Sequence, residues 1–269
     1  MKKLSFLLLL TISLSGYGPP NCYLFEGKCK KACEKAELAI QYAQGSWRSQ
    51  KHFDESIALC PSFDYSYYEK SVPFAKRGQI PEWKKLIDKA VELDPEEHLA
   101  NRGWYHFFFL NNYEKAIKDI EQLSSIKSGD IGSTGDAIYH LELLRGICYA
   151  EIDDFEKALQ VMSKQMKAEN HYISLYDHIC IGYVQMKLGL LEEALTSFTA
   201  QEENNDLADN RYYKAMVLEK LGKLDASKVE LNIALSFYSK GRTMEDGYRE
   251  LPFEIYQIDI ESALADLDK

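Results

Sequence analysis

The sequence lacks the features that mark several common classes of protein. Acidic residues outnumber basic ones by 42 to 32, which gives a formal net charge of −10. A nucleic-acid-binding protein needs a clustered basic face, so this balance argues against a nucleic-acid partner. The sequence also has no Gly-x-Ser-x-Gly, His-Glu-x-x-His or phosphate-binding glycine loop, the motifs of common hydrolases, metalloproteases and nucleotide-binding enzymes. We therefore predict neither catalytic residues nor a cofactor.

Metal-binding patterns are also missing. Six histidines are present, and His178 lies two residues before Cys180, but no further ligands converge on this pair. Packed or solvated histidines are therefore the better interpretation. Asp130 and Asp136 flank a glycine-containing loop, yet an EF-hand needs a denser acidic pattern and a closing glutamate. We predict a linker at this point and no metal site.

The N-terminus has the pattern of a secretory signal. Lys2 and Lys3 precede an apolar stretch from Leu4 to Leu14, and small residues follow it. This stretch is too short to span a bilayer and is typical of a cleaved signal peptide. We predict a signal peptide over residues 1–15, cleaved before Gly16. No second membrane segment follows, so we expect an exported protein, periplasmic or secreted, with no membrane span after signal cleavage.

The first four cysteines lie close to one another in the sequence of an exported chain, where disulfides can form. Cys22 follows Pro-Pro-Asn, which does not resemble a lipoprotein cleavage box. If two helices turn back on each other near Gly45, the start of the first lies beside the end of the second. Cys60 then lies near Cys29 or Cys33, and Cys22 can close on the remaining one.

A chemical role for these cysteines is the alternative. Cys29 and Cys33, with Cys60, could form a redox or metal site, but the spacing is not a usual zinc spacing and no histidine lies within the cluster. Structural disulfides are favoured because an exported protein resides in an oxidising compartment. Cys148 and Cys180 lie within apolar segments and are predicted to be buried, inert thiols.

The strongest positive signal is an internal repeat. Small residues recur twelve positions apart in three segments: Gly146 and Ala158, Gly182 and Ala194, and Ala215 and Ser227. The register extends backwards through further markers, at intervals of 34, 33, 42, 36 and 33 residues: Ser49, Trp83, Ala116, Ala158, Ala194 and Ser227. Small residues at these places allow the backbones of two helices to approach closely. A period of this length predicts a stack of helix pairs.

The repeat resembles that of the tetratricopeptide repeat (TPR) family. The segments RGICYAEIDDFEKAL, IGYVQMKLGLLEEAL, FFFLNNYEKAIKDI and KLIDKAVELDP carry the resemblance. It implies an all-α fold, an α-α superhelix of about six helix pairs with a C-terminal capping helix. We place the solenoid at residues 29–238, after an irregular segment at 16–28. Residues 239–269 then supply a linker and the capping helix, which is predicted to begin at Pro252.

Three departures from the repeat pattern affect the prediction. Trp83 is bulky where a small residue is usual, and the 42-residue interval implies a longer loop over residues 127–136. Pro73 falls inside a predicted helix, where a proline costs about 3 kcal/mol. We therefore expect that helix to kink or to start late.

In the TPR family the first helix of each pair lines a concave groove, and this implies a site here. Helical spacing places these candidate groove residues on that face: Tyr65, Tyr68, Trp104, Phe108, Leu143, Ile147, Tyr176, Tyr183 and Tyr212. An apolar stripe shows only that a face is buried against something, so ordinary core packing remains an equal alternative for each residue. Together they predict a tyrosine-rich apolar groove for a protein or peptide.

The resemblance implies a non-catalytic scaffold that binds a protein or peptide outside the cytoplasm. One alternative is a structural envelope component whose groove is covered by its own chain from Gly241 to Lys269. A thiol- or metal-dependent enzyme centred on the N-terminal cysteines is the other.

Overall fold

The computed structural model describes residues 19–169, 171–246 and 250–267; the predicted signal peptide, residues 1–15, lies outside this part of the chain. Within it the structure is α-helical and has no strand. A short 3-10 helix, η1, is followed by thirteen α-helices: η1 (Cys22–Leu24), α1 (Gly27–Ala39), α2 (Trp47–Leu59), α3 (Asp64–Lys76), α4 (Ile80–Leu93), α5 (Pro95–Leu110), α6 (Tyr113–Ile126), α7 (Leu141–Glu151), α8 (Phe155–Met166), α9 (Asp177–Lys187), α10 (Leu191–Asn205), α11 (Ala208–Lys220), α12 (Leu224–Tyr238) and α13 (Gln257–Leu267).

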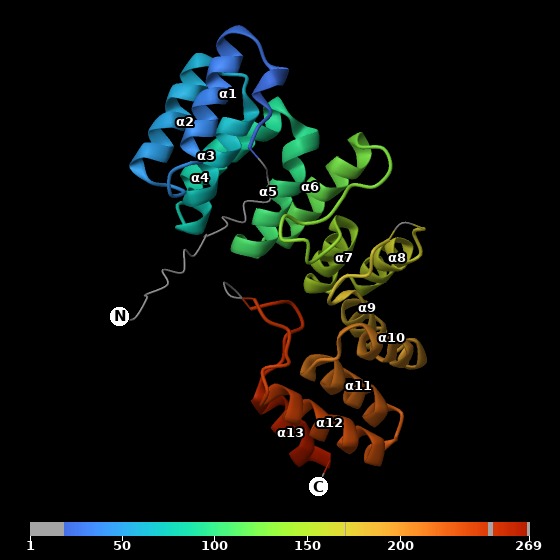
Figure 1. Ribbon diagram of the computed structural model, residues 1–269. Helices are drawn as coiled ribbons and strands as arrows, with labels where there is room; N and C mark the ends of the chain where they lie inside the picture. Colours follow the sequence, from blue (N-terminus) through green and yellow to red (C-terminus); the bar gives the residue numbers. More distant parts are fainter. Residues whose placement is uncertain (1–18, 170, 247–249, 268–269) are drawn as a thin grey trace, which may run out of the picture.

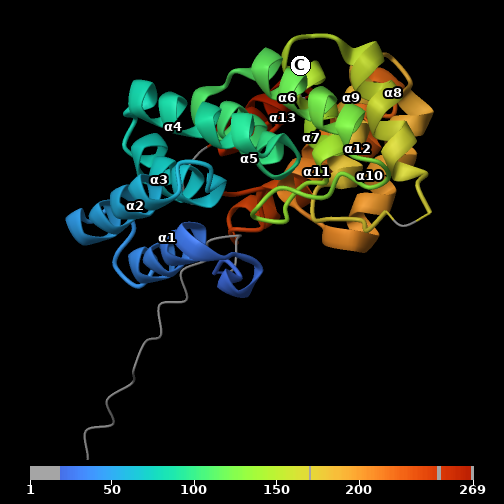
Figure 2. The same ribbon diagram turned by 90° about the horizontal axis from the view of Figure 1, so that it is seen from above.

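The helices form a solenoid of six pairs, as the repeat predicts. Each odd-numbered helix from α1 to α11 packs most extensively against the helix that follows it, and each pair contacts the next pair along the chain. The last helix, α13, packs against α12 and caps the stack. Figure 1 shows the pairs following one another along the stack, and Figure 2 shows the same stack from above.

Glycine and alanine set the packing of the helices within each pair. A Cβ atom at Gly182 on α9 would lie 2.7 Å from the ring of Phe198 on α10, and one at Gly146 would lie 2.5 Å from Met162. Such distances are too short for a side chain to fit without movement. The small markers on the partner helices, including Ala158, are fully buried. The repeated small residues therefore mark the closest helix approaches.

The two departures in the second repeat are accommodated differently from each other. Trp83 is almost completely buried, with its ring centroid 5.8 Å from Tyr105 and 5.3 Å from His106 on α5. Its bulk fills the contact between two repeats. The expectation of a late start caused by Pro73 is wrong, because α3 already begins at Asp64. Pro73 lies in the last turns of α3, so only a short stretch of helix follows it.

The long interval between the third and fourth repeats is an ordered loop, residues 127–140. It extends further than the predicted 127–136, because Asp136 turns the chain by accepting hydrogen bonds from the Thr134 hydroxyl and the Ile138 amide. His140 caps α7 by accepting from the Glu142 amide, and its other ring nitrogen lies 2.8 Å from Asp130.

The predicted start of the C-terminal helix at Pro252 is also wrong. The helix α13 begins at Gln257, and the Tyr256 amide donates to the Asp259 carboxylate in its first turn. The described residues between α12 and α13 form no helix and run back along the solenoid, beside α11 (Figure 1). We call residues 241–246 and 250–256 the strap.

Candidate binding site

The four N-terminal cysteines form two disulfides in the structure. Cys22 is joined to Cys33, which ties η1 to α1, and Cys29 is joined to Cys60, which ties the start of α1 to the end of α2. The Cα atoms of the two pairs lie 5.5 and 5.0 Å apart. These sulfur atoms are thus cross-links and not free thiols, so they offer no nucleophile for the thiol-enzyme alternative.

The other two cysteines lie inside the solenoid. Cys148 on α7 and Cys180 on α9 are both buried. Burial raises the pKa of the Cys180 thiol well above its ordinary value, because the thiolate would lose its hydration. This thiol is therefore protonated and unreactive at neutral pH.

Several predicted groove residues belong to the core. Leu143 and Ile147 are completely buried on α7, so the expectation that they line a binding surface is wrong. Their spacing identified an inward face, but neighbouring repeats cover that face entirely. Tyr176, at the start of α9, is 7% exposed and packs against Tyr139 from the 127–140 loop.

The aromatic residues of the second and third repeats are mostly buried as well. Tyr65, Tyr68 and Phe108 are between 8% and 9% exposed, so little of each ring is available to a partner. Tyr68 stacks on His98, whose ring nitrogen lies 2.7 Å from the Asp64 carboxylate. These contacts join α3 to α5 and stabilise the stack.

Trp104 is the predicted groove residue of the N-terminal half that stays partly exposed. Its ring stacks on Phe108 at 4.6 Å and meets the edges of Tyr105 and Phe109 at 5.2 and 5.8 Å. Phe109 is also partly exposed. Trp104 therefore belongs to an aromatic cluster on α5 with one side open to solvent.

Tyr183 and Tyr212, the predicted groove residues of the C-terminal half, lie under the strap or beside it. Tyr183 on α9 stacks on Phe253 of the strap, with ring centroids 4.1 Å apart. The ring centroid of Tyr213 lies 5.2 Å from that of Tyr183 and 5.3 Å from that of Tyr212. Both predicted residues are partly exposed. The chain's own C-terminal segment thus covers part of this surface.

Two residues of α11 hold the strap, and sequence reasoning missed both. Asp209 is completely buried, and its two carboxylate oxygens accept hydrogen bonds from the Met244 and Ile255 amides, at 2.7 and 3.0 Å. Burial raises the pKa of Asp209 to about 6 despite these bonds. The Tyr213 hydroxyl donates to the Phe253 carbonyl at 2.9 Å. An acidic residue among the buried positions of α11 was the available signal.

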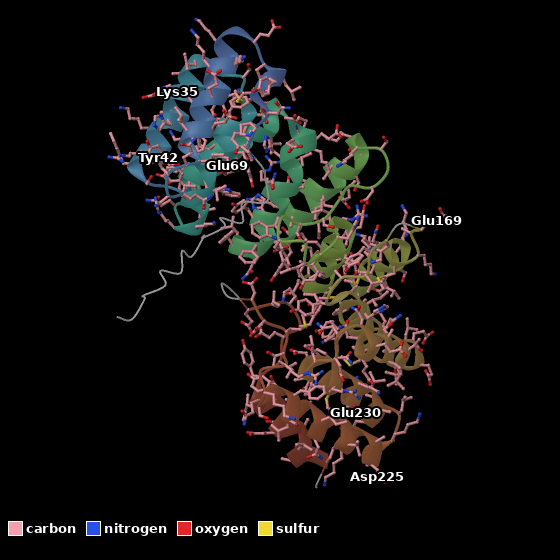
Figure 3. All side chains as sticks on the ribbon, viewed as in Figure 1. Lys35, Tyr42, Glu69, Glu169, Asp225 and Glu230 are labelled. Atoms are coloured by element: carbon pink, nitrogen blue, oxygen red, sulfur yellow. A yellow bond between two sulfur atoms is a disulfide. The ribbon has the colours of Figure 1, made fainter. Side chains whose placement is uncertain are left out.

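A buried acid on α3 was missed in the same way. Glu69 is 5% exposed and lies among the N-terminal helices (Figure 3). Loss of hydration raises its pKa to about 7, although Lys76 acts in the opposite direction. Its charge raises the pKa of the nearby hydroxyls of Tyr65 and Tyr105, secondary to their burial.

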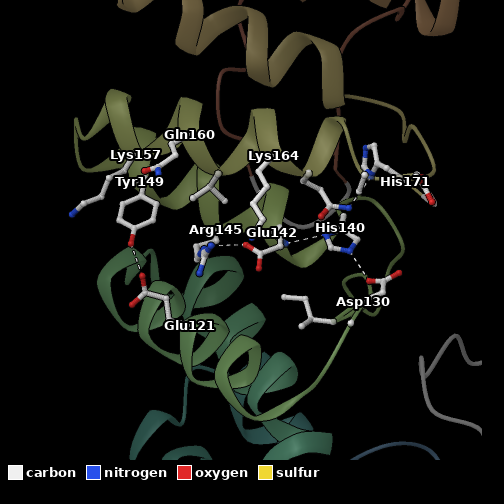
Figure 4. A pocket seen from close by; sticks show the side chains of 16 residues that line it. Glu121, Asp130, His140, Glu142, Arg145, Tyr149, Lys157, Gln160, Lys164 and His171 are labelled. Carbon is white, nitrogen blue, oxygen red and sulfur yellow. Dashed lines mark hydrogen bonds and ion pairs between the residues drawn. The ribbon is translucent and has the colours of Figure 1, made fainter.

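A polar cleft of about 610 Å³ lies between α6, α7, α8 and the 127–140 loop (Figure 4). Within it the Tyr149 hydroxyl donates to Glu121 at 2.6 Å, and the Arg145 guanidinium lies 2.7 Å from Glu142. The first contact joins α7 to α6, whereas the second lies within α7. Lys157 and Lys164 of α8 also line the cleft, so it carries charges of both signs.

Residues 19–169, 171–246 and 250–267 contain no group of three or more His, Cys, Asp or Glu side chains placed to hold a metal ion. The helices of these same segments are too short or too polar to cross a membrane.

No protein-family model matches the sequence. A segment of 74 residues, 27% of this chain, is 30% identical to Hsp70-Hsp90 organizing protein 3 of Arabidopsis thaliana and corresponds to 13% of that protein's length. The chain thus spans a small part of this curated relative.

Solved structures resemble the chain over most of its length. PilW, a widely conserved type IV pilus biogenesis factor, has a TM-score of 0.59 at 15% identity, covering 87% of this chain and 98% of PilW. PilF of Pseudomonas aeruginosa has a TM-score of 0.64 at 11% identity, covering 90% and 100%. YrrB, a TPR protein with an unusual peptide-binding site, has a TM-score of 0.56 at 17% identity, covering 70% and 92%. The chain therefore has the TPR fold, as its repeats predict.

Proposed function

We propose that this protein is a non-catalytic TPR scaffold that binds a polypeptide segment on the concave side of its solenoid, outside the cytoplasm. The proposal rests on the way in which α11 binds the strap. Asp209 and Tyr213 bind main-chain atoms of a segment that has no helix of its own. This surface therefore has the chemistry needed to hold an irregular polypeptide. The similarity to YrrB, described as having a peptide-binding site, supports the same reading.

The position outside the cytoplasm is supported by two features at the same end of the chain. The sequence begins with a signal-type pattern, and the first helix pair carries two disulfides. Disulfides persist in oxidising compartments and are rare where thiols are kept reduced. Fractionation of producing cells tests this placement. We expect a chain that lacks residues 1–15 outside the cytoplasm, and a full-length chain in the cytoplasm would contradict the proposal.

Trp104 is the expected first contact for a partner. Aromatic side chains bury a large area at low entropy cost and are frequent anchors of interfaces. Trp104 is partly exposed at the centre of an aromatic cluster, and none of the described strap contacts involves it. A partner could therefore reach this part of the surface without first moving the strap.

Site-directed photo-crosslinking tests the proposed binding side. A photoreactive phenylalanine analogue at Trp104 should give a discrete polypeptide adduct in the cells that export the protein. The matched control is the same analogue at Val229, a 59% exposed residue of α12. Equal adducts at both positions, or none at Trp104, would refute binding on this side.

A further inference from the structure

The strap is held by its main chain as well as by buried side chains, which include those of Met244, Leu251 and Ile255. Besides the bonds to Asp209 and Tyr213, the Ala208 amide donates to the Arg242 carbonyl at 2.8 Å. Main-chain bonds do not depend on sequence, so the surface that makes them can accept another chain in the same path. The buried side chains supply the sequence-specific contacts, and among them the Phe253 ring stacks on Tyr183; we call this place the slot.

The Asp209 carboxylate is a costly group to keep at this place. It is completely buried, and the strap amides of Met244 and Ile255 occupy both of its oxygens. No ion pair to Asp209 is found among the described residues. A buried carboxylate without hydrogen-bond donors is strongly unfavourable. An occupant of this site must therefore supply hydrogen-bond donors, which the main chain of a polypeptide does and a purely apolar ligand does not.

The backbone of the strap is strained at Phe253. Phe253 has φ of +65°, in the left-handed region that side chains other than glycine rarely adopt. Its ring nevertheless stays buried, at 9% exposure. A strained backbone of this kind persists only where surrounding contacts hold it. A separate peptide that placed an aromatic ring in the same slot with a relaxed backbone would avoid this strain.

The strap can also open without dismantling a repeat. It contains no helix in its described residues, and α11 and α12 make the most extensive helix contact of the molecule with each other. Its first end is anchored by Arg242, whose guanidinium lies 3.7 Å from the Phe237 ring centroid. Its second end leads into α13, which packs on α12. Release of the described strap residues between these anchors therefore breaks no helical hydrogen bonds.

From these observations we propose that the strap is a displaceable intramolecular ligand. The partner that replaces it is an irregular or extended polypeptide segment that carries a large aromatic or aliphatic side chain. That side chain enters the slot at Tyr183 and Tyr213, and the partner's main-chain amides bind Asp209. This inference rests on the proposed function and adds the regulation of the same surface. A tethered occupant has a high effective concentration, so the closed strap lowers the affinity for a free peptide.

Native-state hydrogen exchange of the full chain tests whether the strap opens. The Met244 and Ile255 amides should exchange through a local opening that exposes little surface, and thus depends weakly on denaturant. The Ile147 amide in the core of α7 should follow a larger unfolding event. If the strap amides exchange only with the Ile147 amide, the strap is a permanent part of the core and the proposal is overturned.

Peptide binding tests what replaces the strap. The probe is a fluorescent peptide of residues 250–256, Glu-Leu-Pro-Phe-Glu-Ile-Tyr, in solution. Phe253→Ala in the protein should free the slot, because the strap then loses its stacked ring and a larger fraction of molecules is open. Peptide binding should become about tenfold stronger than in the wild type, which is on the order of the effect of losing one stacked ring. The matched control, Ile258→Ala, alters a 63% exposed residue of α13 and should leave binding unchanged.

Two further binding measurements test whether the aromatic side chain of the peptide enters the slot. A peptide with alanine in place of its phenylalanine should not bind the Phe253→Ala protein, and Tyr183→Ala added to that protein should abolish binding of the original peptide. Equal binding by the wild type and Phe253→Ala would overturn the proposal. These results do not depend on crosslinking at Trp104, so the proposed function and the displaceable strap can fail separately.

Discussion

At the scale of single residues, the glycines on the first helices decide how closely each pair packs. Gly182 lies against the fully buried ring of Phe198. We expect Gly182→Leu to destabilise the protein by roughly 1–3 kcal/mol, because overpacking forces the helices apart. Urea unfolding followed by circular dichroism measures this loss. Gly135→Leu is the control, since a Cβ at Gly135 meets nothing within 4 Å, and an equal loss for both would place the fifth repeat in a different register.

Glu69 makes stability depend on pH. Its pKa is raised from 4.5 to about 7, so between these values the folded state keeps a proton that the unfolded state has lost. Stability should therefore fall as pH rises from about 4.5 to 7, by up to about 3 kcal/mol from this group. Glu69→Gln removes the dependence, so its melting temperature should exceed that of the wild type increasingly as pH rises from 5 to 8.

The control for this titration is Glu82→Gln, which alters an exposed acid of α4. Its melting temperature should follow the wild-type curve across the same range. A constant difference between Glu69→Gln and the wild type at every pH would mean that Glu69 does not titrate in this window.

The binding residues show what a sequence pattern can and cannot predict. Trp104 and Phe108 share the four-residue spacing of Leu143 and Ile147, but Trp104 is partly exposed while the α7 pair is completely buried. The spacing identifies one side of a helix and not what packs across it. Asp209 could not be assigned either, because the strap that explains its burial comes from a distant part of the chain.

At the scale of elements, the first helix pair depends on its disulfides. Its small core forms a hydrophobic cluster of its own, apart from the main one. The bond between Cys29 and Cys60 spans 31 residues and that between Cys22 and Cys33 spans 11. A longer loop loses more entropy on closure in the unfolded chain, so removal of the longer cross-link should cost more, typically about 2–4 kcal/mol.

The paired variants Cys29→Ser/Cys60→Ser and Cys22→Ser/Cys33→Ser test this order without leaving a free partner thiol. Calorimetry should show the lower melting temperature for the first variant. Mass mapping of a non-reduced digest identifies the bonds independently. Free alkylation of Cys60 in the exported wild type would contradict the pairing.

The helix boundaries were predictable where a repeat surrounds them and less so where it does not. The start of α2 at Trp47 has a local signal in the sequence, because the Ser46 side chain caps the helix by accepting a hydrogen bond from the Ser49 amide. The last helix was placed too early because Ile255 continues the apolar spacing of α13. That side chain is buried in the strap instead, where its amide binds Asp209. Periodicity alone cannot separate a helix from an irregular segment that buries the same face.

At the scale of the whole molecule, the aromatic surface of the odd-numbered helices has a covered part and an open part. The strap covers the surface around Tyr183, whereas Trp104 remains partly exposed. One large hydrophobic cluster includes both the core of α7 and the strap residue Phe253. The same packed cluster thus extends from the open part of the surface to the strap.

Two tryptophans contact Tyr105, and a comparison of their alanine variants distinguishes a binding role from a structural one. Trp83 is 1% exposed and Trp104 is partly exposed, although each has its ring centroid within 6 Å of the Tyr105 ring. Trp83→Ala leaves a buried cavity and should cost about 3–5 kcal/mol. Trp104→Ala should cost clearly less and yet abolish the adducts formed by a photoreactive analogue at neighbouring Phe109. Thermal unfolding and adduct yield are measured on the same preparations. If adducts survive in Trp104→Ala, or if its loss of stability equals that of Trp83→Ala, Trp104 acts as core and the partner binds elsewhere.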